Sequence, residues 1–88
     1  MTTHEVALEI RGFIARETGT RDASIIPDDK DLFAEGLLDS LMTVSLVTFC
    51  EQRFGCNIGP DEFSDEAVRT IRGLAAFVSS RAGAGAGA

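Results

Sequence analysis

The 88-residue sequence has no tryptophan, no tyrosine, one histidine and only two cysteines. Two cysteines are too few for a framework of disulfide bonds, and Cys50 and Cys56 lack the paired spacing of a zinc site, so we expect no metal. Basic residues are also scarce, with 8 against 14 acidic residues and a formal net charge of -6. Because nucleic acids and anionic membranes attract positive charge, this balance argues against both as partners.

Long hydrophobic runs are absent as well. No stretch approaches the roughly 18 apolar residues that span a bilayer, and the first residues lack the basic-then-apolar order of a secretory signal, so we expect a cytoplasmic protein. The hydrophobic fraction of 44% is that of a globular chain, and 88 residues are enough for one domain with a single small core. A large multi-domain enzyme is excluded.

Helices are predicted from apolar spacing and capping signals. The first extends to about Glu17, because Thr2 and Glu5 have the spacing of a capping box and Gly19 follows as its end. The second covers about Ser40 to Phe54. Its buried stripe is expected to consist of Leu41, Val44, Val47, Cys50 and Phe54, widened by Leu46 and Phe49.

Two further helices are predicted toward the C-terminus. A short one lies between Gly59 and Thr70, with Phe63 and Val68 as its apolar anchors. The last begins after Thr70 as its cap and ends near Arg81. No segment alternates long enough for a strand, so the fold class is all-α: a four-helix bundle over residues 1–81, followed by a flexible Ala/Gly tail at 82–88.

The connection from Thr20 to Asp39 is unusually long for a helical bundle, where about 2–8 residues are usual. Its apolar residues provide enough surface to hold it against the core: Ile25, Ile26, Leu32, Phe33, Leu37 and Leu38. We therefore expect an ordered loop, which presents the start of the second helix in a fixed position.

Asp39 and Ser40 stand where this loop becomes helix, and both residue types are favoured caps. Such a pair most often serves only to cap the helix. One cap suffices, however, so if Asp39 takes that role the Ser40 hydroxyl is free and faces solvent. A phosphate on Ser40 would be stabilised by unpaired N–H groups and by the positive end of the helix dipole.

The run Asp-Leu-Phe-Ala-Glu-Gly-Leu-Leu-Asp-Ser-Leu at residues 31–41, followed by the helix that ends in Phe54-Gly55, resembles the phosphopantetheine-accepting acyl, peptidyl and D-alanyl carrier proteins. The resemblance covers about residues 6–78. It implies that Ser40 is the attachment point of 4′-phosphopantetheine, with Asp39 as the flanking helix cap. It also implies that a phosphopantetheinyl transferase adds the group from coenzyme A, and that the protein has no catalytic residues and is not an enzyme.

In this family the second helix carries partner recognition, and in fatty-acid carriers its exposed side is acidic. Here Met42 and Ser45 stand at positions that are usually acidic, so the chain is closer to D-alanyl carriers and to stand-alone carriers of secondary metabolism. Met42 has a second interpretation, as a partly buried filler under the loop. The acidic field comes instead from residues 28–66, which hold ten acids against two basic residues. The expected partner surface consists of Leu38, Leu41, Met42 and Ser45.

The leading functional hypothesis is a monomeric carrier that takes an acyl or aminoacyl group from a loading enzyme to downstream enzymes of a polyketide, nonribosomal peptide or related pathway. The length favours a free-standing carrier, and the small core suggests only a shallow groove beside the second helix for the arm. The alternative is an unmodified helical interaction module with a carrier-like fold. Cys50 lies on the apolar stripe and is expected to be buried and inert, whereas Cys56, just past Gly55, is expected to be more exposed.

Overall fold

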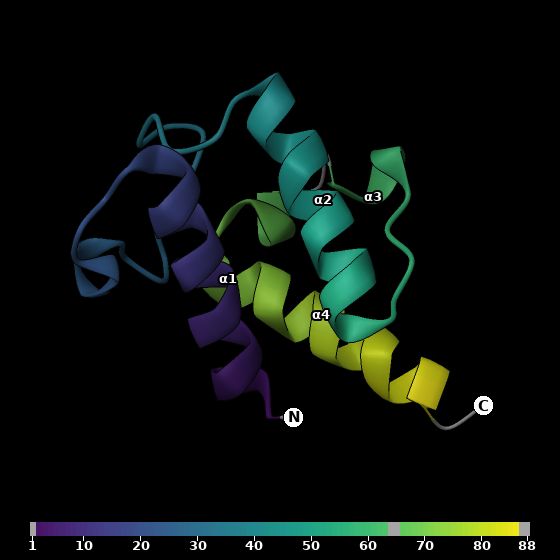
Figure 1. Ribbon diagram of the computed structural model, residues 1–88. Coiled ribbons are helices and arrows are strands. Elements are labelled where there is room, and N and C mark those ends of the chain that lie inside the picture. The colour runs from purple at the N-terminus through teal and green to yellow at the C-terminus, as the bar shows by residue number, and fades with distance from the viewer. Residues whose placement is uncertain (1, 64–65, 87–88) are drawn as a thin grey trace.

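The computed structural model describes residues 2–63 and 66–86, and this part of the chain is helical without any strand. Three longer helices account for most of it: α1 (Thr3–Thr18), α2 (Ser40–Phe54) and α4 (Ile71–Ala86). The shorter elements are a one-turn helix α3 (Pro60–Phe63) and the 3-10 helices η1 (Ala23–Ile25) and η2 (Glu66–Arg69). Helix α4 passes behind α1 and α2 and contacts both (Figure 1). No helix in the described ranges is long and apolar enough to cross a membrane.

The ends of α1 are set by local hydrogen bonds. The Thr2 hydroxyl accepts from the Glu5 N–H at 3.1 Å, and the Glu5 carboxylate accepts from the Thr2 N–H at 2.8 Å, so the predicted capping box is confirmed. The bond from the Thr2 backbone N–H lowers the pKa of Glu5, because it stabilises the charged carboxylate. At the other end Gly19, with φ of 73°, forms the left-handed cap that the sequence predicted.

The core lies where α1, α2 and α4 meet. Its most deeply buried residues come from all three helices and from the long loop: Val6, Ile10, Ile14, Leu32, Leu46, Cys50, Ile71, Leu74 and Val78. Between α1 and α2 the rings of Phe13 and Phe49 stack with their centroids 4.4 Å apart. Within α2, Phe54 meets Phe49 edge-on at 5.9 Å and extends this aromatic cluster.

Helix α2 has the predicted bounds, but it faces the core with a different side. Leu46 and Cys50 are fully buried, whereas Leu41 is 83% exposed and Val44 is 65% exposed. The predicted stripe is therefore wrong at Leu41 and Val44 but right at Cys50. The reason is that apolar residues surround most of this helix, so their period alone does not determine which side meets the core.

The region between Gly59 and Thr70 holds two short elements, α3 and η2, where one short helix was predicted. Val68 is buried as expected, while the side chain of Phe63 lies outside the described part of the structure. Thr70 caps the last helix, since its hydroxyl accepts from the Gly73 N–H at 3.0 Å.

Helix α4 runs past Arg81, where we expected its end, to Ala86. Alanine has the highest helix propensity of all residues, which helps the helix to continue through the alternating glycines. The division into a domain at residues 1–81 and a flexible tail at 82–88 stays a prediction.

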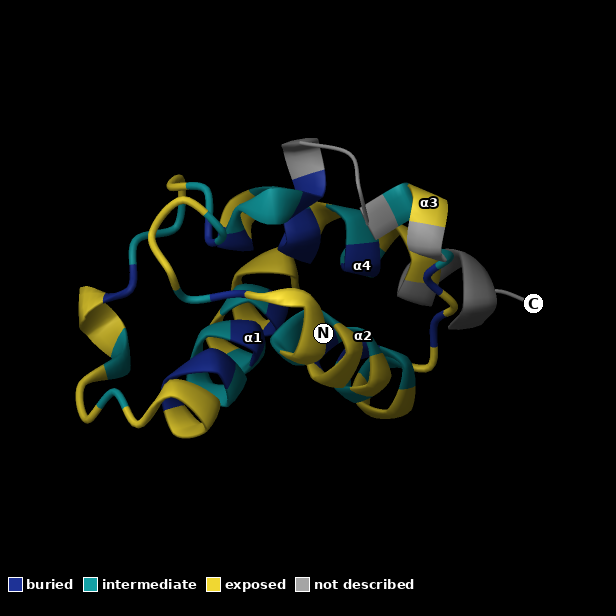
Figure 2. Cartoon of the chain, turned by 90° about the horizontal axis from the view of Figure 1, so that it is seen from above, coloured by how far each residue is buried: buried dark blue, intermediate teal, exposed yellow. Residues whose placement is uncertain are grey.

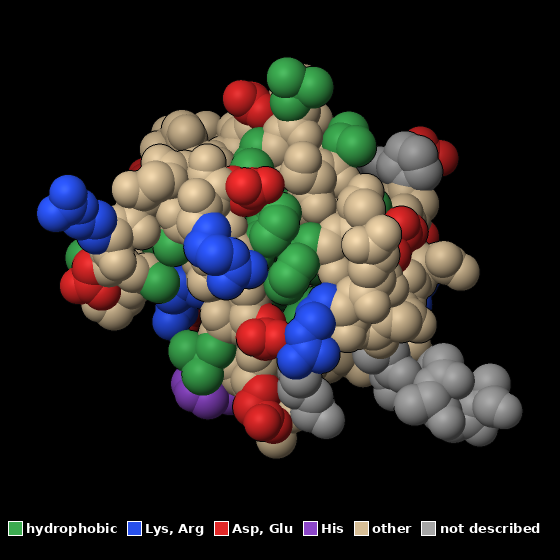
Figure 3. Space-filling view, in the orientation of Figure 1, with side chains coloured by type: hydrophobic (Ala, Val, Ile, Leu, Met, Phe, Trp, Pro, Cys, Tyr) green, Lys and Arg blue, Asp and Glu red, His purple; other side chains and the backbone are tan. Residues whose placement is uncertain are grey.

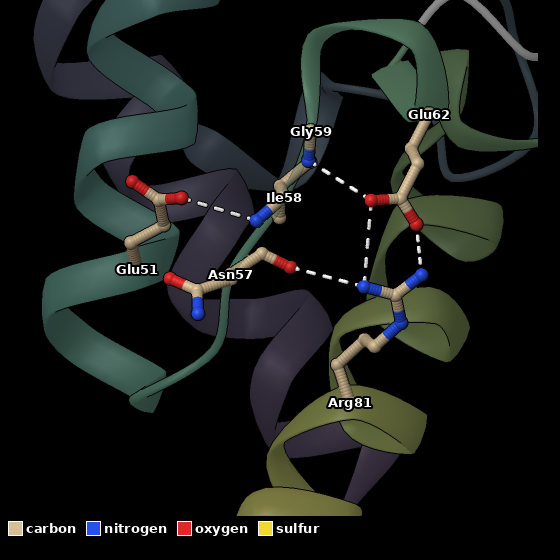
Figure 4. A network of polar contacts seen from close by, with 6 residues as sticks. All are labelled: Glu51, Asn57, Ile58, Gly59, Glu62 and Arg81. Carbon is tan, nitrogen blue, oxygen red and sulfur yellow. Dashed lines mark hydrogen bonds and ion pairs between the residues drawn. The ribbon is translucent and has the colours of Figure 1, made fainter.

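The segment after α2 is tied to both neighbouring helices by a polar network (Figure 4). Arg81 of α4 forms an ion pair with Glu62 of α3, and its guanidinium also donates to the Asn57 carbonyl at 3.2 Å. On the α2 side, the Ile58 N–H donates to the Glu51 carboxylate at 3.0 Å. These contacts fix the path of the chain from α2 to α3.

Candidate functional site: the start of helix α2

The long loop between α1 and α2 is held to the start of α4 by backbone hydrogen bonds. The Leu32 N–H donates to the Arg69 carbonyl at 2.8 Å, and the Arg72 N–H donates to the Asp28 carbonyl at 2.9 Å. Within the loop, the Leu37 N–H donates to the Leu32 carbonyl at 2.9 Å and closes a turn. These backbone hydrogen bonds give the loop the ordered conformation that the sequence predicted.

Charged side chains of α1 and η2 add to this attachment. Arg11 forms an ion pair with Asp28, and Arg69 forms one with Asp31 at 3.3 Å. The Arg69 guanidinium also lies over the Phe33 ring, 4.7 Å from its centroid. The loop therefore contacts the helices through both its acidic and its aromatic side chains.

Burial of the loop is confined to short segments, as Figure 2 shows at one end of the molecule. Ile26, Leu32 and Leu38 are buried, whereas Ile25 is 69% exposed. The prediction that Ile25 pins the loop is therefore wrong, because the short η1 turn directs only its neighbour Ile26 inward. Phe33 and Leu37 are half-buried and pack against the core.

Asp39 takes the cap role that the sequence suggested. Its carboxylate oxygen Oδ1 accepts from the Met42 N–H at 2.8 Å, and its carbonyl accepts from the Thr43 N–H at 2.9 Å. The Thr43 hydroxyl donates to the same carbonyl at 2.7 Å. Two backbone N–H groups of the first turn are thereby satisfied, one by the side chain and one by the main chain.

Ser40 is the first residue of α2, and it is exposed. Its hydroxyl makes no hydrogen bond within the described part of the chain, because Asp39 performs the capping. The N–H groups of Ser40 and Leu41 are the ones that a helix start leaves without an intrahelical partner. An accessible hydroxyl beside unpaired N–H groups and the positive helix end suits a covalently attached phosphate, so these residues fit a phosphopantetheine group.

The surface beside Ser40 is apolar rather than acidic. Leu41 and Val44 are exposed, Ser45 is exposed, and Met42 is half-buried against the core. We call the exposed set of Leu41, Val44 and Ser45, with the accessible edge of Met42, the α2 surface. Sequence reasoning missed Val44, because it had been assigned to the buried stripe.

Leu38 does not belong to this surface. Only 5% of it is exposed, and it lies in the core cluster with its N–H bonded to the Leu32 carbonyl at 3.2 Å. The prediction that Leu38 forms part of the partner surface is therefore corrected. At the end of this loop Leu38 faces inward, whereas Leu37 is half-buried.

The α2 surface itself has no acidic residue. The first turn of α2 has no acidic side chain. Among the loop acids, Asp28 and Asp31 are neutralised in part by Arg11 and Arg69. The negative charge of this loop is therefore smaller near these ion pairs than the number of its carboxylates suggested.

Both cysteine thiols are free and buried. Cys50 has no exposed surface, and burial raises the pKa of its thiol to about 12, which confirms the expected inert group. Cys56 is 7% exposed, so it is more exposed than Cys50, as expected, but it is still buried. Its sulfur turns inward and donates to the Cys50 carbonyl at 3.6 Å, and burial also raises the pKa of this thiol.

The model of the protein family described as "Phosphopantetheine attachment site" matches residues 9–78 of the chain, which include the loop, the whole of α2 and the start of α4. A search of curated proteins found no match.

Proposed function

This chain belongs to the phosphopantetheine attachment site family, and we propose that Ser40 is the residue to which the group is attached. Proteins of this family carry 4′-phosphopantetheine, which a phosphopantetheinyl transferase adds, and they are carriers that interact with biosynthetic enzymes. The chain is accordingly a non-catalytic carrier. The attached group supplies a terminal thiol that holds an acyl or aminoacyl cargo as a thioester.

The observation that carries the choice of Ser40 is its position. Its hydroxyl is exposed at the first residue of α2, while Asp39 provides the cap that a serine would otherwise provide. The neighbouring hydroxyl of Thr43 is already engaged with the Asp39 carbonyl. Ser45 is exposed too, but it lies beyond the first turn, away from the unpaired N–H groups.

The α2 surface is our proposal for the site where partner enzymes dock. Leu41 is 83% exposed and Val44 is 65% exposed, and large exposed apolar side chains next to each other are typical of interaction sites. Such a surface suits a loading enzyme whose contact is more apolar than basic. It supports the proposal of a polyketide, nonribosomal peptide or related secondary pathway.

Three finer descriptions belong with this proposal: a four-helix bundle in which α3 is the short fourth member, a monomeric state and a cytoplasmic location. All three stay predictions from the sequence.

The test is intact-protein mass spectrometry after incubation of the apo-protein with coenzyme A and a broad-specificity phosphopantetheinyl transferase. The wild type is expected to gain one phosphopantetheinyl group, and Ser40→Ala is expected to gain none. Ser45→Ala is the matched control, since it removes an exposed hydroxyl from the same helix and should load normally. Loading of Ser40→Ala would refute the assignment, and no loading of folded wild type would favour the unmodified interaction module.

A further inference from the structure

Arg69, the last residue of η2, contacts three consecutive residues of the long loop. Its guanidinium forms an ion pair with Asp31 at 3.3 Å and lies over the Phe33 ring, 4.7 Å from the centroid. Its carbonyl accepts from the Leu32 N–H at 2.8 Å. Residues 34–68 separate these partners in the sequence, so the contacts join the loop to a distant region before α4.

Two other arginines connect pairs of helices. Arg53 of α2 pairs with Glu9 of α1, and Arg81 of α4 pairs with Glu62 of α3. On the face that Figure 3 shows, the Lys and Arg side chains of the described residues are scattered rather than gathered in one patch. Each arginine therefore acts through its own contacts, and those of Arg69 go to the loop that leads into α2.

Asp31 connects Arg69 to the turn that follows in the loop. Its Oδ2 atom faces Arg69, while its Oδ1 atom accepts from the N–H groups of Phe33 at 2.9 Å and Ala34 at 3.2 Å. Its carbonyl accepts from the Glu35 N–H at 3.0 Å. The two carboxylate oxygens thus have separate roles, one in the ion pair and one in the turn.

The turn leads directly into α2. The Leu32 carbonyl accepts from the N–H groups of Leu37 at 2.9 Å and Leu38 at 3.2 Å. Leu38 is buried in the core, and the next residue is Asp39, which caps α2. A continuous series of contacts therefore extends from Arg69 to the cap of this helix.

We propose that Arg69 is a positioning residue for the modification of Ser40 and acts through Asp31 and Phe33. The inference rests on the proposed function, since it requires transfer of phosphopantetheine to that serine. A transferase that acts at Ser40 meets the loop and the start of α2 together. If only a fraction of the molecules has the arrangement that it binds, the apparent affinity falls by that fraction, whereas the transfer step is unchanged. Arg69 keeps this fraction high.

The contacts require an arginine rather than any positive charge. A guanidinium is planar, so it lies over an aromatic ring and faces a carboxylate at the same time, whereas the ammonium group of lysine is a compact charge. Arg69→Lys is therefore expected to keep the attraction to Asp31 and to lose the contact with Phe33. It provides an intermediate between the wild type and Arg69→Ala.

The experiment measures kcat and KM with the apo-protein as the substrate of a broad-specificity phosphopantetheinyl transferase and with coenzyme A in excess. In Arg69→Ala the KM for the carrier is expected to rise about three- to tenfold, which is the combined effect of a partly exposed ion pair and a cation–π contact. The kcat is expected to stay the same, because the transfer step is unchanged. Arg69→Lys should show a smaller rise in KM.

Two matched variants separate this role from effects of charge and of stability. Arg72→Ala removes an exposed positive charge three residues further on, while the bond from its backbone N–H to the Asp28 carbonyl remains. Arg81→Ala breaks the same two kinds of contact further along α4, an ion pair with Glu62 and a ring contact with Phe77. Both variants should load with the KM of the wild type.

Amide hydrogen exchange of the same variants gives a second readout. Exchange at Leu37 and Leu38, whose N–H groups bond to the Leu32 carbonyl, should become faster in Arg69→Ala. It should stay unchanged in Arg81→Ala, which leaves the loop intact.

An unchanged KM in folded Arg69→Ala, or an equal rise in Arg81→Ala, would overturn the inference while the proposed function stands. If Arg69→Ala does not fold, folded Arg69→Lys decides, and an unchanged KM in that variant would overturn the inference as well. Absence of any mass gain in the wild type would remove both the proposed function and this inference.

Discussion

The cap at Asp39 allows a quantitative test of how the start of α2 is held. The Oδ1 atom of Asp39 accepts from the Met42 N–H at 2.8 Å, and replacing such a cap by alanine costs about 1 kcal/mol. The negative charge at the positive helix end contributes about 0.5 kcal/mol more at an exposed site. Asp39→Ala is therefore expected to lower the free energy of unfolding by about 1.5 kcal/mol, and Asp39→Asn, which keeps the acceptor, by about 0.5 kcal/mol.

The assay is urea and thermal unfolding followed by circular dichroism, since a chain without tryptophan or tyrosine offers little fluorescence signal. For a domain of this size, 1 kcal/mol corresponds to about 4–8 °C in Tm, so the alanine variant should melt about 6–12 °C lower. Asp29→Ala is the matched control, because it removes the same charge from an exposed loop position without removing a cap. If the asparagine variant loses as much stability as the alanine variant, the charge and not the hydrogen bond holds the helix start, and the reasoning is refuted.

The remaining predictions concern other parts of the molecule. The two buried thiols should resist alkylation at neutral pH in the folded protein and react fully in urea, and rapid reaction of either one in the folded protein would contradict its burial. Burial raises the pKa of Cys50 from 9.0 to about 12, so the stability it contributes is fully present below pH 9 and is lost as the pH rises toward 12. Denaturant titrations should show a larger loss in the wild type than in Cys50→Ala, in which the buried thiol of Cys56 is the one that remains. Leu41→Glu changes an exposed side chain, so the free energy of unfolding should change by less than about 0.5 kcal/mol. The rate of loading by the cognate enzyme should fall, and an unchanged rate would remove Leu41 from the docking site. Arg81→Ala breaks a partly exposed ion pair with Glu62, and we expect it to lower the free energy of unfolding by about 0.5–1 kcal/mol. Hydrogen exchange of the Ile58 and Gly59 amides should become faster, and unchanged exchange would show that the network does not hold this segment.

The boundaries of α1 and α2 could be predicted because they depend on local chemistry, whereas the end of α4, which lacked such a signal, was placed too early. Thr2, Gly19, Asp39 and Gly55 all act as caps in the structure, and α2 spans the predicted residues. A cap requires only a few neighbouring residues, so its pattern is visible in the sequence. The position of Ser40 at the start of a helix followed from the same local reasoning.

The direction of single side chains could not be predicted where two apolar residues were equally suitable. Of Ile25 and Ile26 only the second is buried, and of Leu37 and Leu38 the second is the more buried. On α2 the apolar residues leave more than one possible buried face, and contacts with α1 and α4 determine which one is used. These contacts join residues far apart in the sequence, and neither apolar periodicity nor a capping motif indicates them.

The attachment of the long loop to the start of α4 has a consequence for the exchange of segments between related carriers. The loop meets residues 69–72 through two backbone bonds, from Leu32 to Arg69 and from Arg72 to Asp28, and through the contacts of Arg69 with Asp31 and Phe33. A chimaera that receives the loop and α2 from another carrier but keeps its own residues 69–72 loses these side-chain partners. The loop and residues 69–72 thus form one unit of recombination, although residues 40–68 separate them in the sequence.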